Sequence, residues 1–356
     1  MKILELTRLF YPSIGGMEKF VANRLKIYKA LGCDYQVITT NSNGAQIEKP
    51  KIKKDVISLN SFTHFVITTG LKNVLKLNYD ILSVNEVGYY YSYYAVKHAF
   101  NAGKKIILTP HYYFHTDNYR FVKKMHKKYV LPKILRMVDK IIVFTKSEKK
   151  FWTDSFPFTQ DKIDIIPHYF APDKEVVKNN IIDNKFFLYL GRGGRNKRTD
   201  LLIKAFCQIE SFNYKLYLTL SENELSDAAK ECVNLSDKIE LLGCVSEEYK
   251  HQLLSECSAL VFPTDHEAFG IVNFEASFYK KPLIITNLKI FNEILNNKGI
   301  IYFENTVDDI KKKILEFIKL PEKKRSEMGE YNFNNLKRYT FDKAEDKYEL
   351  LFKELI

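Results

Sequence analysis

The chain has 356 residues, of which 46% are apolar and 28% charged, so we expect a globular protein of two domains, because one hydrophobic core seldom supports this length. No window approaches the roughly 18 uninterrupted apolar residues of a membrane span, and the first apolar run is too short for a signal peptide. Five cysteines without the paired spacing of zinc or disulfide scaffolds fit a reducing cytoplasm. The net charge of +12 is uneven: residues 1–170 hold 27 Lys and Arg against 13 Asp and Glu, which indicates an anionic membrane, acidic acceptor or nucleic acid as partner.

The first half of the chain alternates short apolar runs with helical stretches. Residues 3–7 are predicted as a buried strand and residues 17–31 as a helix, which stops at Gly32. Gly15 and Gly16 lie between the two, although most such pairs only form turns. Further strands are predicted at residues 36–40, 80–84, 105–108, 140–144 and 163–166. This alternation predicts a doubly wound parallel sheet.

Two features follow strand ends in this half. His111 comes after the strand at residues 105–108, where a side chain faces the ligand crevice, although a single histidine is more often a hydrogen-bonded structural residue. Five tyrosines lie between Tyr89 and Tyr94. They are suited to stacking on sugar rings, or they begin a helix that places some rings in the core and some in water.

The segment from Arg120 to Val130 predicts a basic amphipathic helix. Its apolar side consists of Phe121, Val122, Met125 and Tyr129, and its basic side of Arg120, Lys123, Lys124, Lys127 and Lys128. Helices of this kind lie on anionic membranes. The alternative is an ordinary surface helix with a solvated basic face.

The second half begins after residues 167–185, which read as a linker between domains. A strand is predicted at residues 186–190, and a glycine-rich basic turn at residues 191–197 separates it from a helix. By itself such a turn is a solvated charge run. Its cations are Arg192 and Lys197.

The most informative stretch follows a strand predicted at residues 258–262. It contains Glu267 and Glu275, and the helix predicted at residues 270–279 is apolar nearly all round and therefore buried. Amides at a helix start bind phosphate, which gives a candidate phosphate seat: Phe269, Gly270, Ile271 and Val272. A buried carboxylate such as that of Glu275 needs hydrogen-bond partners, and hydroxyl groups of a ligand could provide them. Alternatively, Glu267 complements the helix dipole and Glu275 bonds a neighbouring side chain.

The spacing of these two glutamates, with Phe269 and Gly270 between them and Ala276 after them, resembles the signature of the retaining glycosyltransferases of family 4. Segments in the same order extend the resemblance over nearly the whole chain. It implies an α/β protein of the GT-B fold, with two Rossmann-like doubly wound domains and a cleft between them. The acceptor-binding domain would comprise residues 1–168 plus 333–356, because a final helix crosses back to it. Residues 169–332 would bind the nucleotide-sugar.

The resemblance assigns roles in the donor site. Glu267 would hold hydroxyls of the donor hexose, Glu275 the ribose, and the amides of residues 269–272 the diphosphate. Arg192 and Lys197 match the cations on that diphosphate, which suits a guanidinium and an ammonium. The segment at residues 221–224 replaces the family's glycine-rich nucleotide loop, so no base contacts carry over.

The N-terminal half matches the family less completely. The loop with Gly15 and Gly16 is similar to the family loop whose glycines approach the donor phosphate and sugar. His111 matches a histidine beside the donor hexose and inherits a catalytic role, but Tyr112 stands where the family often has an acidic residue. His168 and Tyr169 depart from the family's Asn-Gly after the linker proline.

The function implied is transfer of a hexose from a UDP- or GDP-sugar to a hydroxyl of a glycan or lipid-linked acceptor, with retention, in cell-surface polysaccharide or glycolipid synthesis. Glu267, His111, Arg192 and Lys197 would be the catalytic residues. No Asp-x-Asp motif lies near them, so we expect neither a metal nor a cofactor. The enzyme would be peripheral on the inner face of the plasma membrane, held by residues 120–130, and no nucleic acid is expected.

Two rival classes stay open. The first is another GT-B enzyme, a sugar-nucleotide epimerase or a phosphorylase, which the reaction product distinguishes from a glycosyltransferase. The second is a nucleic-acid-binding protein, suggested by the basic first half. It predicts salt-sensitive binding, but it leaves a buried Glu275 unexplained.

Overall fold

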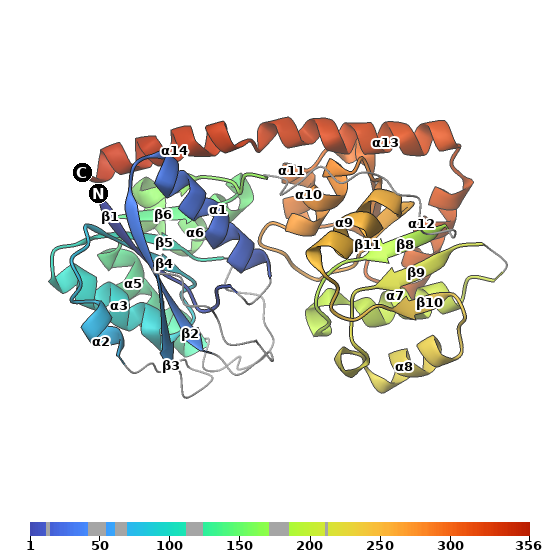
Figure 1. The fold of residues 1–356 in the computed structure, drawn as a ribbon, viewed down its shortest axis with the longest axis horizontal. Helices are drawn as coiled ribbons and strands as arrows, with labels where there is room; N and C mark the ends of the chain where they lie inside the picture. The colour runs from blue at the N-terminus through green and yellow to red at the C-terminus, as the bar shows by residue number, and fades with distance from the viewer. Residues whose placement is uncertain (12–14, 42–54, 61–69, 112–123, 171–184, 211–212) are drawn as a thin grey trace. The chain divides into compact units, whose positions relative to one another are not determined.

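The computed structural model describes residues 1–11, 15–41, 55–60, 70–111, 124–170, 185–210 and 213–356. The chain divides into two compact units. Unit 1 comprises Met1–Tyr169 and Thr340–Ile356, and unit 2 comprises Phe170–Tyr339. Each unit is built on one parallel sheet flanked by helices, which confirms the predicted α/β class (Figure 1).

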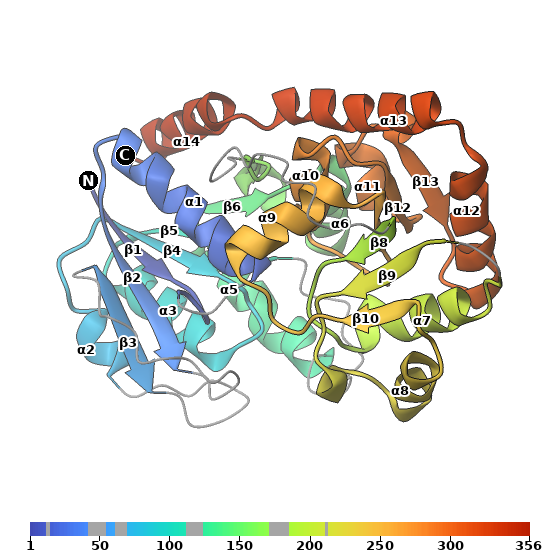
Figure 2. The ribbon, with the colours of Figure 1, turned by 45° about the vertical axis from the view of Figure 1, so that its right-hand side comes forward.

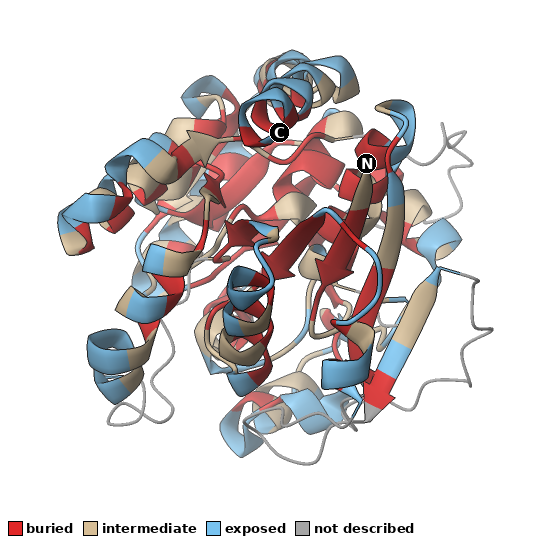
Figure 3. Cartoon of the chain, turned by 90° about the vertical axis from the view of Figure 1, so that its left-hand side faces the viewer, coloured by how far each residue is buried: buried red, intermediate tan, exposed pale blue. Residues whose placement is uncertain are grey.

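Unit 1 contains a seven-stranded parallel sheet in the order β3-β2-β1-β4-β5-β6-β7. The strands are β1 (Lys2–Leu6), β2 (Asp34–Asn41), β3 (Val56–Asn60), β4 (Ile81–Asn85), β5 (Lys105–Thr109), β6 (Lys140–Val143) and β7 (Ile163–Ile165). The central strands β1, β4 and β5 are almost wholly buried (Figure 3), because helices cover both faces of a parallel sheet. The β3 strand was missed by sequence reasoning, since it is a short strand at the edge of the sheet in which Val56 and Ile57 are only partly buried and Ser58 is exposed.

The helices of unit 1 are α1 (Gly16–Ala30), α2 (Leu71–Val74), α3 (Tyr90–Asn101), a π-helical turn (His126–Val130), α5 (Leu131–Met137), α6 (Lys146–Ser155) and α14 (Phe341–Leu355). The predicted helix at residues 17–31 corresponds to α1. The tyrosine run begins α3, where Tyr91 is buried and Tyr90 is exposed. The tyrosine run therefore matches the interpretation as a helix start with some rings in the core and some in water.

Unit 2 contains a six-stranded parallel sheet in the order β10-β9-β8-β11-β12-β13. The strands are β8 (Phe186–Tyr189), β9 (Lys215–Leu218), β10 (Ile239–Leu241), β11 (Ala259–Phe262), β12 (Leu283–Thr286) and β13 (Ile300–Phe303). The helices are α7 (Thr199–Cys207), α8 (Asp227–Asn234), α9 (Glu247–Glu256), α10 (Ile271–Phe278), α11 (Lys289–Ile294), α12 (Val307–Lys319) and α13 (Glu322–Asn335). Within this unit α7 and α8 lie on one face of the sheet, and α9, α10 and α11 lie on the other (Figure 2).

The boundary predicted at residue 333 differs from the structure, where unit 2 continues to Tyr339. Side-chain amides hold α13 in that unit. Asn332 donates to the carbonyls of Lys281 and Gly299, each at 2.9 Å, and Asn335 donates to that of Ile294 at 2.8 Å. Hydrogen bonds of asparagine side chains produce no apolar periodicity in the sequence, so the sequence pattern did not reveal that α13 belongs to unit 2.

The segment Thr340–Ile356 belongs to unit 1, where α14 packs on α1. The Tyr28 ring lies 6.2 Å from that of Tyr348 and 5.8 Å from that of Phe352. Among the described residues, none of the helices has the length and apolar character needed to cross a membrane.

Candidate active site

The centre of the unit 2 sheet is the place where its connections change direction. Strands β8 and β11 are neighbours, and the chain proceeds outward from them on opposite sides. Loops that follow two such strands diverge and leave a crevice for ligands at the carboxyl edge. The glycine-rich turn follows β8 and the Glu267 loop follows β11, so the predicted donor residues meet at one edge.

Direct contacts join these two loops. The Asn196 carbonyl accepts hydrogen bonds from the Asp265 amide at 2.8 Å and from the Thr264 hydroxyl at 3.2 Å. The Lys197 ammonium donates to a carboxylate oxygen of Glu267 and lies 5.0 Å from the centre of the Phe262 ring. Two residues 70 positions apart, predicted separately as donor contacts, are therefore ion-paired.

A second set of contacts shapes the glycine-rich turn. The Gly193 amide donates to Glu224 at 2.7 Å, and a Cβ at position 193 would lie 2.5 Å from the Glu224 Cβ, so only glycine fits. Glu224 also closes a capping box with Ser221. The Tyr189 hydroxyl donates to the Arg192 carbonyl at 2.9 Å, and burial, with the charges of Glu267 and Glu224, raises its pKa. Sequence reasoning missed Glu224, because the segment at residues 221–224 lacks the family's glycines, and it missed Tyr189, because an aromatic residue inside a buried strand is typical of the core.

The start of α10 has the geometry of an anion site. Gly270 has φ 73°, and a Cβ there would lie 2.8 Å from Phe291 and 2.9 Å from the Asn273 amide, so glycine is required. Among the described residues no side chain caps this first turn. Phe269 is buried and stacks on Phe274 at 4.6 Å, which anchors the loop. The amides that follow, at Ile271 and Val272, are those that a helix offers to an anion.

Glu275 is buried, as predicted, and the structure gives it a protein partner. Its carboxylate lies 3.0 Å from the Lys250 ammonium on α9, which also contacts Glu247 at 2.5 Å. The interpretation in which Glu275 bonds a neighbouring side chain therefore describes the observed contact. Lys250 was missed, because a single lysine in a helix usually points to solvent. Arg192 differs from these residues in having an exposed side chain.

In unit 1 the predicted glycines lie at the start of α1. Gly15 is extended, with φ 179°, and its carbonyl accepts from the Lys19 amide at 3.1 Å, while Gly16 is the first helical residue. Residues 12–14 of the same loop lie outside the described residues, as does Tyr112.

His111 lies beyond the carboxyl end of β5 with φ 52°, and its Nε2 is 3.1 Å from Asn85 Oδ1. The Asn85 amide nitrogen donates to Glu5 at 2.6 Å and to the Leu6 carbonyl at 3.1 Å, so its oxygen is the group that faces His111. His111 Nε2 must then carry the proton, which leaves Nδ1 as a hydrogen-bond acceptor.

A buried ion pair lies behind His111. Arg24 of α1 pairs with Glu5 of β1, and it also donates to Asn85 at 2.8 Å and to Thr109 at 2.9 Å. Burial, helped by the Arg24 charge, lowers the pKa of His111 to about 3. The imidazole is therefore neutral at physiological pH. Glu5 inside an apolar strand was the sequence signal that should have indicated this pair.

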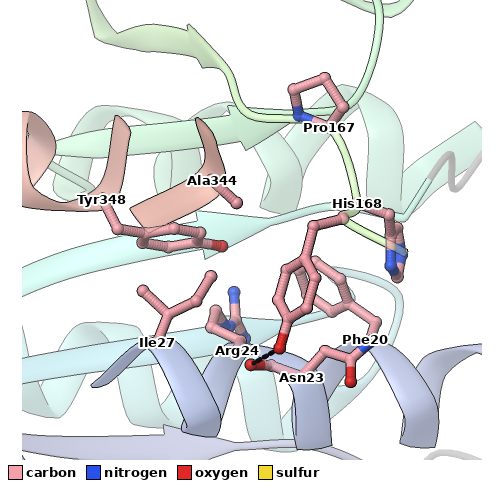
Figure 4. Close-up of a pocket in the computed structure, with 9 residues that line it drawn as sticks. Phe20, Asn23, Arg24, Ile27, Pro167, His168, Ala344 and Tyr348 are labelled. Atoms are coloured by element: carbon pink, nitrogen blue, oxygen red, sulfur yellow. Dashed lines mark hydrogen bonds between the residues drawn. The ribbon is translucent and has the colours of Figure 1, made fainter. Parts of the chain in front are cut away.

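The residues that depart from the family pattern pack on α1. The Tyr169 hydroxyl donates to the Asn23 carbonyl at 2.9 Å, and the His168 ring lies 4.2 Å from that of Phe20. Figure 4 shows these side chains in a pocket that Arg24 and Tyr348 also line. The end of unit 1 is thus tied to α1.

The basic segment is described from Lys124 onward, and residues 120–123 lie outside the described residues. Met125 and Tyr129, predicted for its apolar side, are 42% and 50% exposed. Lys124, Lys127 and Lys128 are exposed as well. The described part of the segment therefore presents both apolar and basic side chains to solvent.

Two family models match the chain. The model of Glycosyltransferase Family 4 matches residues 14–174, and that of the Glycosyl transferases group 1 matches residues 173–335. The chain belongs to glycosyltransferase family 4. This confirms the family predicted from the two glutamates and makes the chain a glycosyltransferase.

Relatives of this family 4 glycosyltransferase support the same assignment. It is 28% identical to an uncharacterized glycosyltransferase of Methanocaldococcus jannaschii, over 100% of this chain and 99% of the relative. It is 22% identical to the GDP-mannose:cellobiosyl-diphosphopolyprenol alpha-mannosyltransferase of Komagataeibacter xylinus, over 83% of this chain and 78% of the relative. The structure of Anabaena HepE in complex with UDP and glucose matches with a TM-score of 0.80 at 15% identity, over 100% of both chains, which confirms the GT-B fold.

Proposed function

We propose that this glycosyltransferase moves a hexose from a UDP- or GDP-sugar to a hydroxyl of a glycan or lipid-linked acceptor, with retention at the anomeric carbon. The Lys197–Glu267 pair beside the start of α10 carries this proposal. A cation, a carboxylate and helix amides together complement the phosphates and hydroxyls of a sugar diphosphate. The names of the relatives support the donor class, since one uses GDP-mannose and HepE was solved with UDP and glucose.

Each donor group then has a protein partner. Lys197, Arg192 and the amides of residues 269–272 bind the diphosphate, and Lys197 exchanges its contact with Glu267 for phosphate oxygens. Glu267, released from that ion pair, accepts hydrogen bonds from hexose hydroxyls. Glu275 reaches the ribose, and Gly15 and Gly16 allow close approach of the chain to the donor. Neither a metal nor another cofactor takes part in this proposal.

The reaction is a displacement on one face of the sugar. The bond between the anomeric carbon and the diphosphate oxygen breaks, the acceptor oxygen bonds to that carbon, and the acceptor proton passes to the leaving diphosphate. Lys197, Arg192 and the α10 amides stabilise the charge that develops on the diphosphate. Because His111 is neutral and its Nδ1 is an acceptor, it orients a sugar hydroxyl and does not act as an acid.

The acceptor side is proposed to include a membrane. Met125 and Tyr129 are exposed next to three lysines, which suits insertion of apolar groups at an anionic lipid surface. The excess of positive charge in residues 1–170 acts in the same direction. A relative that acts on a diphosphopolyprenol supports a lipid-linked acceptor. The enzyme would be peripheral on the inner face of the plasma membrane, with a role in polysaccharide or glycolipid synthesis.

A panel of nucleotide-sugars tests the donor, with GDP-mannose and UDP-glucose first. A ligand at 100 times its dissociation constant raises the free energy of unfolding by about 2.7 kcal/mol, which a thermal shift detects. The stabilising donor is then incubated with polyprenol-linked or soluble glycosides, and the anomeric configuration of the product is read by NMR. An inverted product contradicts retention, and epimerised nucleotide or sugar phosphate contradicts transfer.

Glu275→Gln tests the ribose assignment separately. If Glu275 bonds the ribose, affinity for the nucleoside diphosphate falls by about 1 to 3 kcal/mol, the cost of a lost hydrogen bond to a charged group. If Glu275 serves only Lys250, the melting temperature falls and the affinity measured by calorimetry stays at the wild-type value.

A further inference from the structure

The carboxyl edge of the unit 1 sheet has its own change of direction. Strands β1 and β4 are neighbours, and the connections lead away from them on opposite sides. This is the position at which open α/β sheets bind ligands. Arg8 follows β1 and Glu86 follows β4, so a cation and a carboxylate meet there.

Glu86 and Arg8 are paired but incompletely satisfied. Glu86 Oε2 lies 3.5 Å from Arg8 Nε and 3.4 Å from the Tyr91 hydroxyl, both at or beyond the usual limit for strong hydrogen bonds. The Nε proton of Arg8 is buried without a hydrogen-bond partner among the described residues. The side chains are 32% and 15% exposed, so a ligand can reach them.

The backbone holds Glu86 in an unfavourable conformation. It has φ 66°, which costs a residue other than glycine about 1 kcal/mol or more. The Glu86 amide donates to the carbonyl of Thr109 at 3.0 Å. Thr109 precedes His111 by two residues in the sequence, so this hydrogen bond holds Glu86 close to the His111 loop. Strained residues concentrate at active sites and ligand contacts. The strain at Glu86, at the carboxyl edge of the sheet and close to a predicted catalytic histidine, is therefore consistent with a side chain that is oriented towards a ligand.

Aromatic rings fix the two side chains. The Arg8 guanidinium lies 5.3 Å from the centre of the Tyr89 ring, and Tyr89 stacks on buried Tyr91 at 5.8 Å. Tyr91 also supports the carboxylate through its hydroxyl. Neither Arg8 nor Glu86 is therefore free to swing away, which keeps the site ready for a ligand.

We propose that Glu86 and Arg8 form a subsite for the sugar hydroxyls of the acceptor, a role that rests on the proposed function. Glu86 accepts a hydrogen bond from one hydroxyl, and Arg8 Nε donates to the oxygen of the same or the adjacent hydroxyl. With Glu86 ionised the pair has no net charge, so it suits a neutral sugar. A phosphate would meet the Glu86 carboxylate and be repelled.

Glu86 also makes the subsite sensitive to pH. Burial raises the pKa of its carboxyl to about 7 although Arg8 opposes the shift, and Glu18, Tyr89 and Tyr91 are the other titratable groups that act on this pair. The ionised carboxylate is the better acceptor, so sugar binding strengthens as the pH rises through 7. A variant that lacks the Glu86 carboxyl should not show this increase in sugar affinity with pH.

The test measures glycoside binding directly. Methyl glycosides of glucose, mannose, galactose and N-acetylglucosamine are titrated into the full chain with GDP or UDP present, and binding is followed by saturation-transfer NMR at pH 6 and pH 8. Glu86→Gln and Arg8→Gln should each weaken glycoside binding at least about 10-fold. Glu86→Gln should also abolish the pH dependence of binding. Glu349→Gln, an exposed carboxylate on α14, is the matched control and should bind as the wild type.

The outcomes separate this subsite from the proposed function. Glycoside binding that is equal in the wild type and in folded Glu86→Gln and Arg8→Gln overturns the subsite, as does the absence of any Glu86-dependent signal. Binding of inorganic phosphate that needs Arg8, without glycoside binding, also overturns it. Glu86-dependent glycoside binding by a protein that ignores every nucleoside diphosphate would overturn the proposed function and leave the subsite. If Glu86→Gln does not fold, as its melting temperature shows, Arg8→Gln decides.

Discussion

Lys197 and Glu267 form an ion pair that donor binding has to break. Because both are charged and paired in the structure, Glu267→Gln should lower kcat at least about 100-fold through lost hexose contacts, the size found for a single transition-state hydrogen-bond donor or acceptor. Affinity for the free nucleoside diphosphate should be unchanged or higher, because Lys197 no longer has a competing carboxylate. Steady-state kinetics and calorimetry measure the two effects. Glu240→Gln, an exposed carboxylate near Lys215, is the control, and a variant with full kcat would remove Glu267 from the site.

His111 gives a prediction about stability. Its pKa is about 3 in the folded chain and near 6.5 when unfolded, so the unfolded state binds the proton first. The contribution of His111 to the free energy of unfolding should therefore be constant above about pH 6.5 and fall below it, by up to about 1.4 kcal/mol per pH unit. Glu86, whose folded pKa is raised to about 7, contributes in the opposite direction between about pH 4.5 and pH 7, so the His111 effect is read as the difference between the wild type and a His111 variant. Burial also lowers the pKa of His168, which adds in the same direction. Urea unfolding at pH 7, 6 and 5 should show a shallower fall for His111→Asn, and an identical fall in both proteins would contradict the neutral imidazole.

At the scale of an element, the basic segment makes the membrane proposal testable. Each lysine near an anionic surface contributes about 1 kcal/mol, so replacing Lys124, Lys127 and Lys128 by Gln should weaken binding to vesicles with anionic lipid about 100-fold. Donor affinity should not change. Vesicle flotation measures the first effect and calorimetry the second.

A matched triple variant controls for charge alone. Lys312, Lys323 and Lys324 are exposed lysines of unit 2, and their replacement by Gln removes the same charge. If both triple variants lose vesicle binding equally, net charge and not the segment at residues 120–130 is responsible.

Elements whose apolar side chains face the core could be predicted from the sequence. The buried central strands of both sheets, α1 and α10 have that pattern, whereas the edge strand β3 lacks it. Glu267 could be placed because it follows a buried strand. Elements held by polar contacts could not. The α13 helix is fixed by asparagine amides, Glu275 by a lysine from another helix, and His111 by an asparagine from the next strand. Those partners lie 25 or more positions away, and periodicity carries no information about them.

For the whole molecule, α14 decides whether unit 1 is stable. It buries Tyr348, Leu351, Phe352 and Leu355 in that unit. Four such side chains stabilise by about 6 to 12 kcal/mol at ~1.5–3 kcal/mol each, which lies within the ~5–15 kcal/mol stability of a typical domain. A chain ending at Tyr339 should therefore keep a folded unit 2 and lose unit 1.

Calorimetry and limited proteolysis check this outcome. The shortened chain should show one unfolding transition and a protected fragment from unit 2, and it should still bind the nucleoside diphosphate. A second transition that belongs to unit 1 would show that α1 and the sheet do not need α14. A chain ending at Leu355 leaves the helix intact and is the control.

The return of α14 to unit 1 also determines when that unit can finish folding during synthesis. Unit 2 is continuous in sequence, from Phe170 to Tyr339, so it can fold as soon as it has been made. Unit 1 has to wait for residues 340–356 while unit 2 is translated, on the order of 10 to 30 s at ~5–20 residues per second. During that time Tyr28 and the surface of α1 around it are uncovered. The first half of the gene would therefore encode the last unit to reach its native state, and a ribosome that stalled within the second half would leave a nascent chain exposed to chaperones and proteases.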